Sequence, residues 1–288
     1  MILGLIGGVD IKKYTVADIM WGKISELSGI KFDFKIFSIK NFADLCRFYW
    51  SYSENSDFIG FNVALPWKSE IIKLVDFVDS DSKIYESINT VYKKDLNVYA
   101  SNTDIAGVEQ ALLKHTELKN KKVLIIGAGG AGLPTSIYLS QKHKCKIFLY
   151  DIKDFNVYTP NITKLKNNKD IKKEKYDIII NATPVGKFYL NEVPDKFSLP
   201  LSFDLLKEIT HNESIIQEMN YFPLNTEIMK FGLLNNLKVI SGIEMLVYQA
   251  LASFKFFTEG YEFEDKNITE LINFINNYAI NKEYELFR

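Results

Sequence analysis

Short apolar runs and periodic apolar positions alternate along the first hundred residues. Apolar or alternating runs predict strands over residues 2–6, 32–39, 58–65, 87–92 and 98–100. Apolar positions at helical spacing predict helices over residues 16–27, 41–52 and 68–77, with a polar loop over residues 9–15. Strands alternating with helices indicate an α/β unit with a mostly parallel sheet.

The second part of the chain repeats this alternation. A helix over residues 104–114 leaves the first unit. Further strands are predicted over residues 122–126, 146–150, 176–181, 214–221 and 238–241, and further helices over residues 133–142, 165–172 and 226–235. Helices over residues 244–257 and 267–278 follow, and we expect them to return to the first unit.

A glycine-rich turn joins the apolar strand at residues 122–126 to the helix that follows it. The spacing of Gly127, Gly129 and Gly132 is G-x-G-x-x-G, typical of a dinucleotide site between a strand and a helix. Gly127 permits the tight turn, Gly129 lets the backbone approach a pyrophosphate, and Gly132 lets the helix pack on the strand. The helix start would face the phosphates. The alternative is an ordinary glycine-rich turn, but the flanking strand and helix favour nucleotide binding.

Composition narrows the classes of partner. The 288 residues suffice for one large or two ordinary domains, and a net charge of −1 gives no sign of a nucleic-acid or membrane partner. Cys46 and Cys145 lie far apart, so we expect neither a metal site nor a disulfide framework. No apolar run approaches the ~18 residues of a membrane span. A reducing cytoplasm and a small-molecule partner are therefore expected.

Polar residues follow the predicted strands of the first unit. The carboxyl ends of parallel strands share one edge of a sheet, so Lys68, Asn89, Asn102 and Asp104 can converge on one site. Three of them have an ordinary alternative: Asp104 as a helix N-cap, Lys68 as a surface lysine, and Asn89 as a turn residue. Their occurrence together, ahead of a dinucleotide turn, favours the site.

The ordered motifs resemble the shikimate dehydrogenase and quinate/shikimate dehydrogenase family. They are G-L-I-G at 4–7, N-V-A-L-P-W-K at 62–68, I-N-T-V at 88–91, N-T-D-I-A-G at 102–107, the glycine turn at 127–132, I-N-A-T-P-V-G at 180–186, Y-F-P-L-N-T at 221–226 and G-I-E-M-L-V-Y-Q at 242–249. The match runs from Gly4 to about Phe256 in the family's order.

The resemblance implies a two-domain α/β fold with the active site in a cleft. Residues 1–104 with the C-terminal helices (243–288) would form the substrate-binding and catalytic domain, and residues 105–242 a doubly wound Rossmann-type NAD(P)-binding domain. The implied activity is the NAD(P)-dependent interconversion of 3-dehydroshikimate and shikimate, or of a close cyclic analogue. Lys68 and Asp104 would be the catalytic acid–base pair.

The remaining site residues are also implied by the resemblance. Those placed at the substrate are Thr15, Ala17, Ala64, Asn89, Tyr221 and Gln249. Those placed along the cofactor are Gly127, Ala128, Gly129, Gly130, Ala131, Asp151, Ile152, Lys153, Thr183, Pro184, Val185, Gly186, Met219 and Gly242.

Two departures from the family pattern concern the substrate carboxylate. Family members carry S-x-S after the first strand and N-V-T after the third, whereas this chain has Thr15-Val16-Ala17 and Ala64. Two hydroxyl donors are therefore missing. Either Lys12, Lys13 or Tyr14 supplies another anchor for the carboxylate, or the ligand has none.

A third departure concerns the cofactor. NADP-using members show N-R-T where this chain has Asp151-Ile152-Lys153. A carboxylate there suits a free ribose 2′-hydroxyl and repels a 2′-phosphate, which favours NAD and leaves NADP possible if Lys153 offsets the charge. The alternative is that Asp151 only caps the next turn.

Other functions stay open. One is a dehydrogenase for a different cyclic polyol or an aminoshikimate-like substrate, and another is a nucleotide-binding homologue without catalysis. The second is disfavoured because Lys68, Asp104, Asn89 and Gln249 are all present. Methylene-tetrahydrofolate dehydrogenases share the architecture, but the N-T-D and Q-A segments do not suit them. The chain would act as a monomer or a homodimer.

Overall fold

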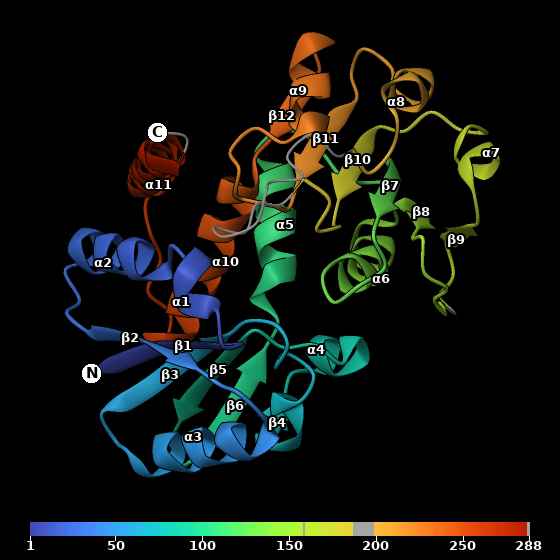
Figure 1. Cartoon of the computed structure of the whole chain (residues 1–288). Helices are drawn as coiled ribbons and strands as arrows, with labels where there is room; N and C mark the ends of the chain where they lie inside the picture. Colours follow the sequence, from blue (N-terminus) through green and yellow to red (C-terminus); the bar gives the residue numbers. More distant parts are fainter. Residues whose placement is uncertain (158, 187–198, 287–288) are drawn as a thin grey trace. The chain divides into compact units, whose positions relative to one another are not determined.

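The computed structural model describes residues 1–157, 159–186 and 199–286, with only the backbone for Tyr14 and for residues 283–286 (Figure 1). The chain divides into two compact units. One comprises Met1–Ala106 with Gln249–Ile275, and the other comprises Gly107–Tyr248 with Asn276–Arg288. The predicted boundary after residue 104 lies two residues before the observed one, and the predicted boundary after residue 242 lies six residues before the observed one. The prediction also placed residues 276–288 in the first unit.

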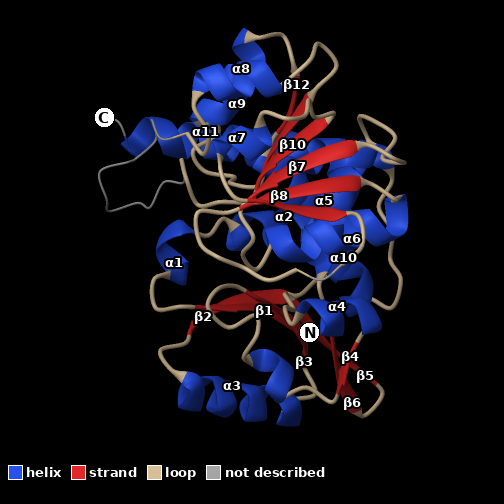
Figure 2. Ribbon diagram, turned by 90° about the vertical axis from the view of Figure 1, so that its right-hand side faces the viewer, coloured by secondary structure: helices blue, strands red, loops and turns tan. Residues whose placement is uncertain are grey.

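The first unit is built on a mixed sheet. Its strands, β1 (Ile2–Gly7), β2 (Asp33–Ser38), β3 (Phe58–Val63), β4 (Phe77–Val78), β5 (Thr90–Lys94) and β6 (Asn97–Ser101), lie in the order β2-β1-β3-β5-β6-β4. Strand β1 runs parallel to β2 and β3, whereas β5 runs antiparallel to β3 and β6. The carboxyl ends of β1 and β3 therefore share one edge. Figure 2 shows this sheet in red.

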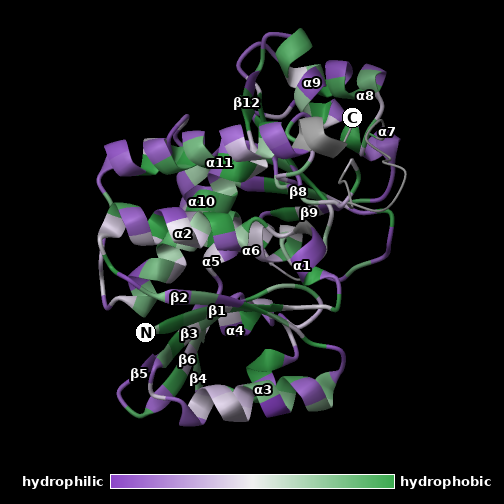
Figure 3. Cartoon of the chain, turned by 60° about the vertical axis from the view of Figure 1, so that its left-hand side comes forward, coloured by the Kyte–Doolittle hydropathy of each residue, from purple (hydrophilic) through white to green (hydrophobic). Residues whose placement is uncertain are grey.

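Helices cover both faces of this sheet. They are α1 (Ile11–Tyr14), α2 (Ala17–Ser28), α3 (Phe42–Glu54) and α4 (Ser80–Tyr85). Helix α3 begins at Asn41, whose side chain accepts the Asp44 N–H at 2.9 Å. It buries Leu45, Tyr49 and Tyr52, spaced to share one helix face. Figure 3 shows the resulting mixture of hydrophobic and hydrophilic residues along α2 and α3.

The chain returns to the first unit over Gln249–Ile275, a shorter stretch than the predicted residues 243–288. Helix α10 (Gly242–Phe257) carries Phe254 and Phe257, whose rings lie 6.1 and 5.7 Å from that of Trp21 on α2. A Cβ on Gly60 would lie 2.4 Å from the Phe257 ring, so glycine is required there. Helix α11 (Asp265–Leu286) places Glu270 at 2.8 Å from Lys23 of α2.

The second unit is a doubly wound parallel sheet. Its strands, β7 (Lys122–Ile126), β8 (Lys146–Tyr150), β9 (Ile162–Leu165), β10 (Ile178–Asn181), β11 (Ile215–Glu218) and β12 (Lys238–Ile240), lie in the order β12-β11-β10-β7-β8-β9. All neighbouring strands are parallel. Counted within this unit the order is 3-2-1-4-5-6, that of a Rossmann domain. The predicted fold class is confirmed.

Helices on both faces explain why β7 is apolar over residues 123–126. They are α5 (Thr103–Leu113), α6 (Gly132–His143), α7 (Asn168–Ile171), α8 (Phe203–Ile209) and α9 (Glu227–Leu234). Val123 and Ile125 of β7 belong to one buried cluster with Leu139 of α6. Leu124 and Ile126 belong to another, on the face covered by α8 and α9. None of the described helices is long and apolar enough to cross a membrane.

Two predicted helices are wrong. Residues 68–77 form turns and a short 3₁₀ helix (Ile71–Lys73) before β4, because Asp76 exchanges hydrogen bonds with Val98 of β6: its backbone N–H donates at 3.1 Å and its carboxylate accepts at 2.8 Å. Leu165 ends strand β9, and only Asn168–Ile171 is helical beyond it. The sequence prediction also lacked α1, α4 and α8.

Candidate functional site

A lysine–aspartate pair lies in the first unit. Lys68 follows β3, and its Nζ donates to Oδ2 of Asp104, in the first turn of α5. Their side chains are 19% and 13% exposed, so a ligand can reach a pair that water solvates poorly. The Ile88 N–H donates to the Lys68 carbonyl at 3.0 Å and fixes the turn that carries the lysine.

Asn89 holds the aspartate in place. Its Nδ2 donates to Asp104 Oδ1 at 2.8 Å and to Gln249 Oε1, on α10, at 3.3 Å. Its Oδ1 accepts the backbone N–H of Thr103 at 2.7 Å. The structure therefore brings together Lys68, Asn89, Asp104 and Gln249, as the sequence predicts. Asn89 already uses both its donor and its acceptor atoms within the protein.

Asn102, rather than Asp104, supplies the side-chain acceptor at the start of α5. Its Oδ1 accepts the Asp104 N–H at 3.0 Å, and its Nδ2 donates to the Ser87 carbonyl at 2.9 Å. The carboxylate of Asp104 is left for Lys68 and Asn89. The alternative role of Asp104 as a helix N-cap is therefore wrong.

A buried polar layer, absent from the predicted site, lies behind these residues. Asn62, Thr90, Thr103 and Ser253 are all buried. The Ser253 hydroxyl is 2.7 Å from that of Thr90 and 2.9 Å from that of Thr103, and it accepts from Asn62 Nδ2 at 2.9 Å. Ser253 also donates to the Gln249 carbonyl at 3.0 Å. The available sequence signal was a serine one helical turn after Gln249 in a mostly apolar helix.

The predicted carboxylate loop lies beside the ends of β1 and β3. Thr15 is buried, and its Oγ1 accepts the Ala17 N–H at 3.1 Å at the start of α2. Ala64 donates its N–H to the Ile6 carbonyl at 2.8 Å. The hydrogen bonds of the described residues do not connect Thr15, Ala17 or Ala64 to Lys68.

The alternative anchors in this loop differ in their contacts. Lys13 pairs with Asp10 at 2.6 Å, whereas the side chain of Lys12 is exposed at the surface. The side chain of Tyr14 lies outside the described part of the chain.

The glycine turn of the second unit has the predicted geometry. Gly127 has φ +103°, which favours glycine. A Cβ on Gly132 would lie 1.9 Å from the Gly127 carbonyl oxygen, whereas no atom of the described residues lies within 4 Å of one on Gly129 or Gly130. Gly129 and Gly130, which lack side chains, and Ala131 thus precede α6, and a backbone of this kind suits a bound pyrophosphate.

Asp151 is attached to this turn. Its Oδ2 accepts the Ala128 N–H at 2.7 Å, and its Oδ1 accepts the Lys153 N–H at 2.8 Å. Ile152 between them is exposed. Asp151 therefore does bind the following turn, as the alternative interpretation held, but it also keeps its charge beside the glycines.

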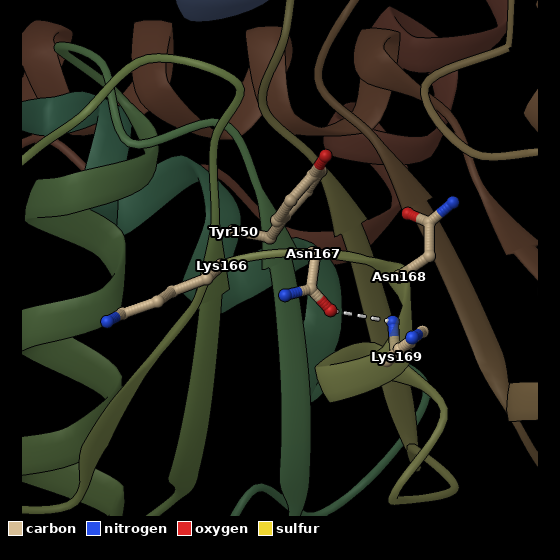
Figure 4. A pocket seen from close by; sticks show the side chains of 5 residues that line it. All are labelled: Tyr150, Lys166, Asn167, Asn168 and Lys169. Atoms are coloured by element: carbon tan, nitrogen blue, oxygen red, sulfur yellow. Dashed lines mark hydrogen bonds between the residues drawn. The ribbon is translucent and has the colours of Figure 1, made fainter.

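A concave region of about 490 Å³ lies at the carboxyl ends of β8 and β9 (Figure 4). It is lined by Tyr150 and the four consecutive residues Lys166, Asn167, Asn168 and Lys169. Asn167 accepts the Lys169 N–H at 2.9 Å. The sequence prediction missed these residues because it treated residues 165–172 as a helix.

The other predicted cofactor residues lie in the loops after β10 and β11. Thr183 Oγ1 donates to Asn181 Oδ1 at 2.7 Å and accepts the Val185 N–H at 3.2 Å. Pro184 and Gly186 belong to the same loop. Met219 follows β11, and its N–H donates to the Asn181 carbonyl at 3.0 Å.

Gly242 and Tyr221 belong to the same region. A Cβ on Gly242 would lie 2.2 Å from the Asn220 carbonyl oxygen and 2.8 Å from the Tyr221 nitrogen. Glycine at position 242 therefore lets the start of α10 contact the loop after β11.

These features define a class of protein. A partly buried lysine–aspartate pair in the first unit and a glycine turn in the Rossmann-type second unit are the parts of a dinucleotide-dependent oxidoreductase.

Comparisons with known proteins identify the family. A model of the shikimate dehydrogenase substrate binding domain matches residues 6–91. Shikimate dehydrogenase (NADP(+)) of Methanococcus maripaludis is 30% identical over 266 residues, covering 89% of this chain and 91% of the relative. The chain belongs to the shikimate dehydrogenase family, a family of oxidoreductases.

Solved structures share the fold. Shikimate 5-dehydrogenase from Thermus thermophilus, in complex with NADP(H) and shikimate, matches with a TM-score of 0.77 at 21% identity, covering 95% of this chain and 99% of that one. The enzyme from Listeria monocytogenes, in complex with shikimate and NAD, matches with a TM-score of 0.79 at 22% identity, covering 94% and 96%.

The glycines make a prediction that separates folding from binding. Gly132→Ala should lower the free energy of unfolding by about 1–3 kcal/mol, because its Cβ collides with backbone. Gly129→Ala should leave the free energy of unfolding unchanged, because its Cβ points into open space. The same Cβ should weaken dinucleotide binding, because it occupies space that the pyrophosphate needs. Urea unfolding and NADH titration measure the two effects. Equal stability of the two variants would contradict this division of roles.

Proposed function

We propose that the protein is an NAD(P)-dependent oxidoreductase that interconverts 3-dehydroshikimate and shikimate, or a close cyclic analogue. The observation that carries the proposal is the Lys68–Asp104 pair, held by Asn89 and accessible at its surface. Support comes from eight relatives at 29–35% identity, all named shikimate dehydrogenase (NADP(+)). Substrate binding and proton transfer belong to the first unit and dinucleotide binding to the second.

The pair handles the proton of the reacting hydroxyl. A bound nicotinamide supplies the acceptor or donor of hydride. Among the described residues, Asp104 is the partner of Lys68 Nζ, so the lysine retains donors for the substrate oxygen. In alcohol oxidation the Lys68–Asp104 pair takes the hydroxyl proton, and in ketone reduction it returns that proton. Lys68 also stabilises the negative charge that develops on this oxygen.

Asn89 and Gln249 fix Asp104 and border the substrate. The Asn89 amide already donates to both Asp104 and Gln249. To donate to a ring hydroxyl, it must therefore give up one of these two hydrogen bonds. Tyr221, Thr15, Ala17 and Ala64 complete the proposed substrate set.

This chain differs most from the family pattern in the residues expected to bind the substrate carboxylate. Thr15 keeps one hydroxyl of the family pattern, while Ala17 and Ala64 lack theirs. A desolvated carboxylate without donors is costly. Either Lys12 or Lys13 replaces the missing donors, or the preferred ligand is a cyclic polyol without a carboxylate, which is the second candidate function.

For the cofactor we propose a preference for NAD, with NADP also bound. The relatives' names favour NADP(+). The charge of Asp151, beside the Ala128 N–H, opposes a 2′-phosphate. Three lysines could offset the negative charge of Asp151. They are Lys153 and, in the concave region of Figure 4, Lys166 and Lys169. We also assign the enzyme to a reducing compartment, in keeping with its free Cys46 and Cys145.

The acid–base pair makes the first functional prediction. Lys68→Ala should lower kcat for shikimate oxidation by roughly a hundredfold or more, the scale of a positioned acid–base group. Affinity for the dinucleotide should change little. The control is Lys73→Ala, since Lys73 is exposed, its Nζ pairs with Glu70 at 2.7 Å, and it lies 5.7 Å from the centre of the Phe42 ring. A nearly normal kcat in the Lys68 variant would refute the assignment.

The second functional prediction concerns Asp151. Wild-type kcat/KM should be higher with NAD than with NADP, and Asp151→Asn should narrow the ratio because it removes the charge that repels a 2′-phosphate. Steady-state kinetics with both cofactors measure the ratio. If the wild type prefers NADP clearly, the lysines near Asp151 dominate and the proposed preference is wrong.

The third functional prediction concerns Ala17 and Ala64, where the family pattern has hydroxyl residues near the substrate carboxylate. Wild-type KM for shikimate should be high, and the double variant Ala17→Ser with Ala64→Thr should lower it by about tenfold or more, since hydrogen bonds to charged groups are the strong ones. The same change should not help a cyclitol without a carboxylate.

Lys12→Ala and Lys13→Ala test the alternative anchor. Tight shikimate binding in the wild type that survives loss of both lysines would contradict the interpretation of this loop.

A further inference from the structure

A buried carboxylate, Glu218, lies between the two loops that carry the proposed cofactor residues. Glu218 ends strand β11, and it has no exposed surface. Asn181 lies opposite it on β10 and donates from Nδ2 to its two carboxylate oxygens at 3.1 and 2.9 Å. Thr226, at the start of α9, donates its hydroxyl to Oε2 at 2.7 Å.

Asn220 completes the shell of donors. Its backbone N–H and its Nδ2 donate to Glu218 Oε1 at 2.8 and 3.0 Å. All these groups are uncharged donors that point at the carboxylate. A carboxylate has no proton of its own and can accept from all of these donors. The amide of a glutamine cannot, because its nitrogen is itself a donor.

The same side chains continue from the carboxylate to the loop after β10. Asn181 Oδ1 accepts the Thr183 N–H at 3.1 Å and its hydroxyl at 2.7 Å. Asn220 Nδ2 also donates to the carbonyls of Thr183 and Val185 at 2.9 and 3.3 Å. Glu218 thereby orients two asparagines, and these hold the loop that contains Thr183, Pro184, Val185 and Gly186.

The carboxylate also fixes both ends of the loop after β11. Asn220 and Thr226 both donate to it, and Tyr221 lies between them in sequence. The Thr226 hydroxyl makes no capping bond to α9, so its bond to Glu218 is its main contact. One buried acceptor thus determines the course of two loops.

We propose that Glu218 is a positioning residue for the nicotinamide half of the dinucleotide: its carboxylate fixes the loops after β10 and β11 in the conformation that binds this half. The inference rests on the proposed function, since it assumes that these loops contact the cofactor. Glu218 itself touches neither cofactor nor substrate.

Burial raises the pKa of Glu218 to about 7, despite the hydrogen bonds from Asn220, Asn181 and Thr226 that lower it. The nearest charged residue along the chain from these partners, Glu227, pairs with Lys230 at 2.6 Å. A group with a raised pKa is increasingly protonated below about pH 7, and the protonated form cannot accept from every donor around it.

The test is Glu218→Gln, which keeps the shape and replaces one acceptor oxygen with a donor. NADH affinity, measured by fluorescence titration, should fall about tenfold, the loss expected when buried donors lose their acceptor. Affinity for ADP-ribose, which lacks nicotinamide, should stay within about twofold. A general loss of stability would lower both affinities alike.

Two further variants serve as controls. Gln217→Met changes the preceding, equally buried residue of β11, whose side-chain amide has no partner among the described residues, and it should leave both affinities unchanged. Glu218→Asp keeps the charge on a side chain one methylene shorter, and it should recover part of the lost NADH affinity.

A pH series tests the inference on the wild type. Wild-type affinity for NAD should fall between pH 8 and pH 6, as Glu218 becomes protonated. The control variant Gln217→Met should show the same pH profile as the wild type. Glu218→Gln should lack this step. If that variant does not fold, the wild-type profile and Glu218→Asp decide.

Unchanged NADH affinity in Glu218→Gln, equal losses for NADH and ADP-ribose, or a flat wild-type profile would each overturn the inference. A wild type that binds NADH but does not oxidise shikimate would overturn the proposed substrate alone. A wild type that binds no dinucleotide would overturn both proposals.

Discussion

The first unit depends on the shared use of Asn89. Its carbonyl oxygen is held by the backbone N–H of Thr103, so its amide can point only toward Asp104 and Gln249. Asp104 is thereby fixed between a neutral donor and Lys68. Because the acid–base pair is only partly exposed, its attraction is screened less than that of a surface ion pair. A short segment after a buried strand thus presents a charged pair in a defined orientation.

Close backbone contacts position two helix starts of the second unit, alongside the side-chain hydrogen bonds around Glu218. Gly132 and Gly242 both occupy positions where a Cβ would collide with backbone, at the starts of α6 and α10. Helix starts that approach the strand ends this closely bring their N–H groups to the edge where a phosphate or a ribose binds. The open positions Gly129 and Gly130 then leave room for the ligand.

Local patterns were sufficient for much of the fold and for part of the site. The apolar strands, the glycine turn and the group of Lys68, Asn89, Asp104 and Gln249 could be predicted, because each rests on spacing within a few residues or on an ordered motif. The helix expected over residues 68–77 failed because Asp76 pairs with Val98, a partner 22 residues away. Strand β9 was missed because it lies at a sheet edge with the polar residues Thr163 and Lys164. The hydrogen-bond partners of Ser253 and Glu218 could not be predicted, because only the folded chain shows what they contact.

The buried hydroxyls of Thr90, Thr103 and Ser253 have a consequence for how this protein can vary. Each hydroxyl has a single hydrogen, and the three lie 2.7–3.0 Å from one another. Removing one leaves each of its neighbours one hydrogen bond short in a buried region, whereas replacing all three with apolar groups of similar shape removes these donors and acceptors together. Substitutions at these positions should therefore be strongly epistatic, and tolerated sequences should change them as a set.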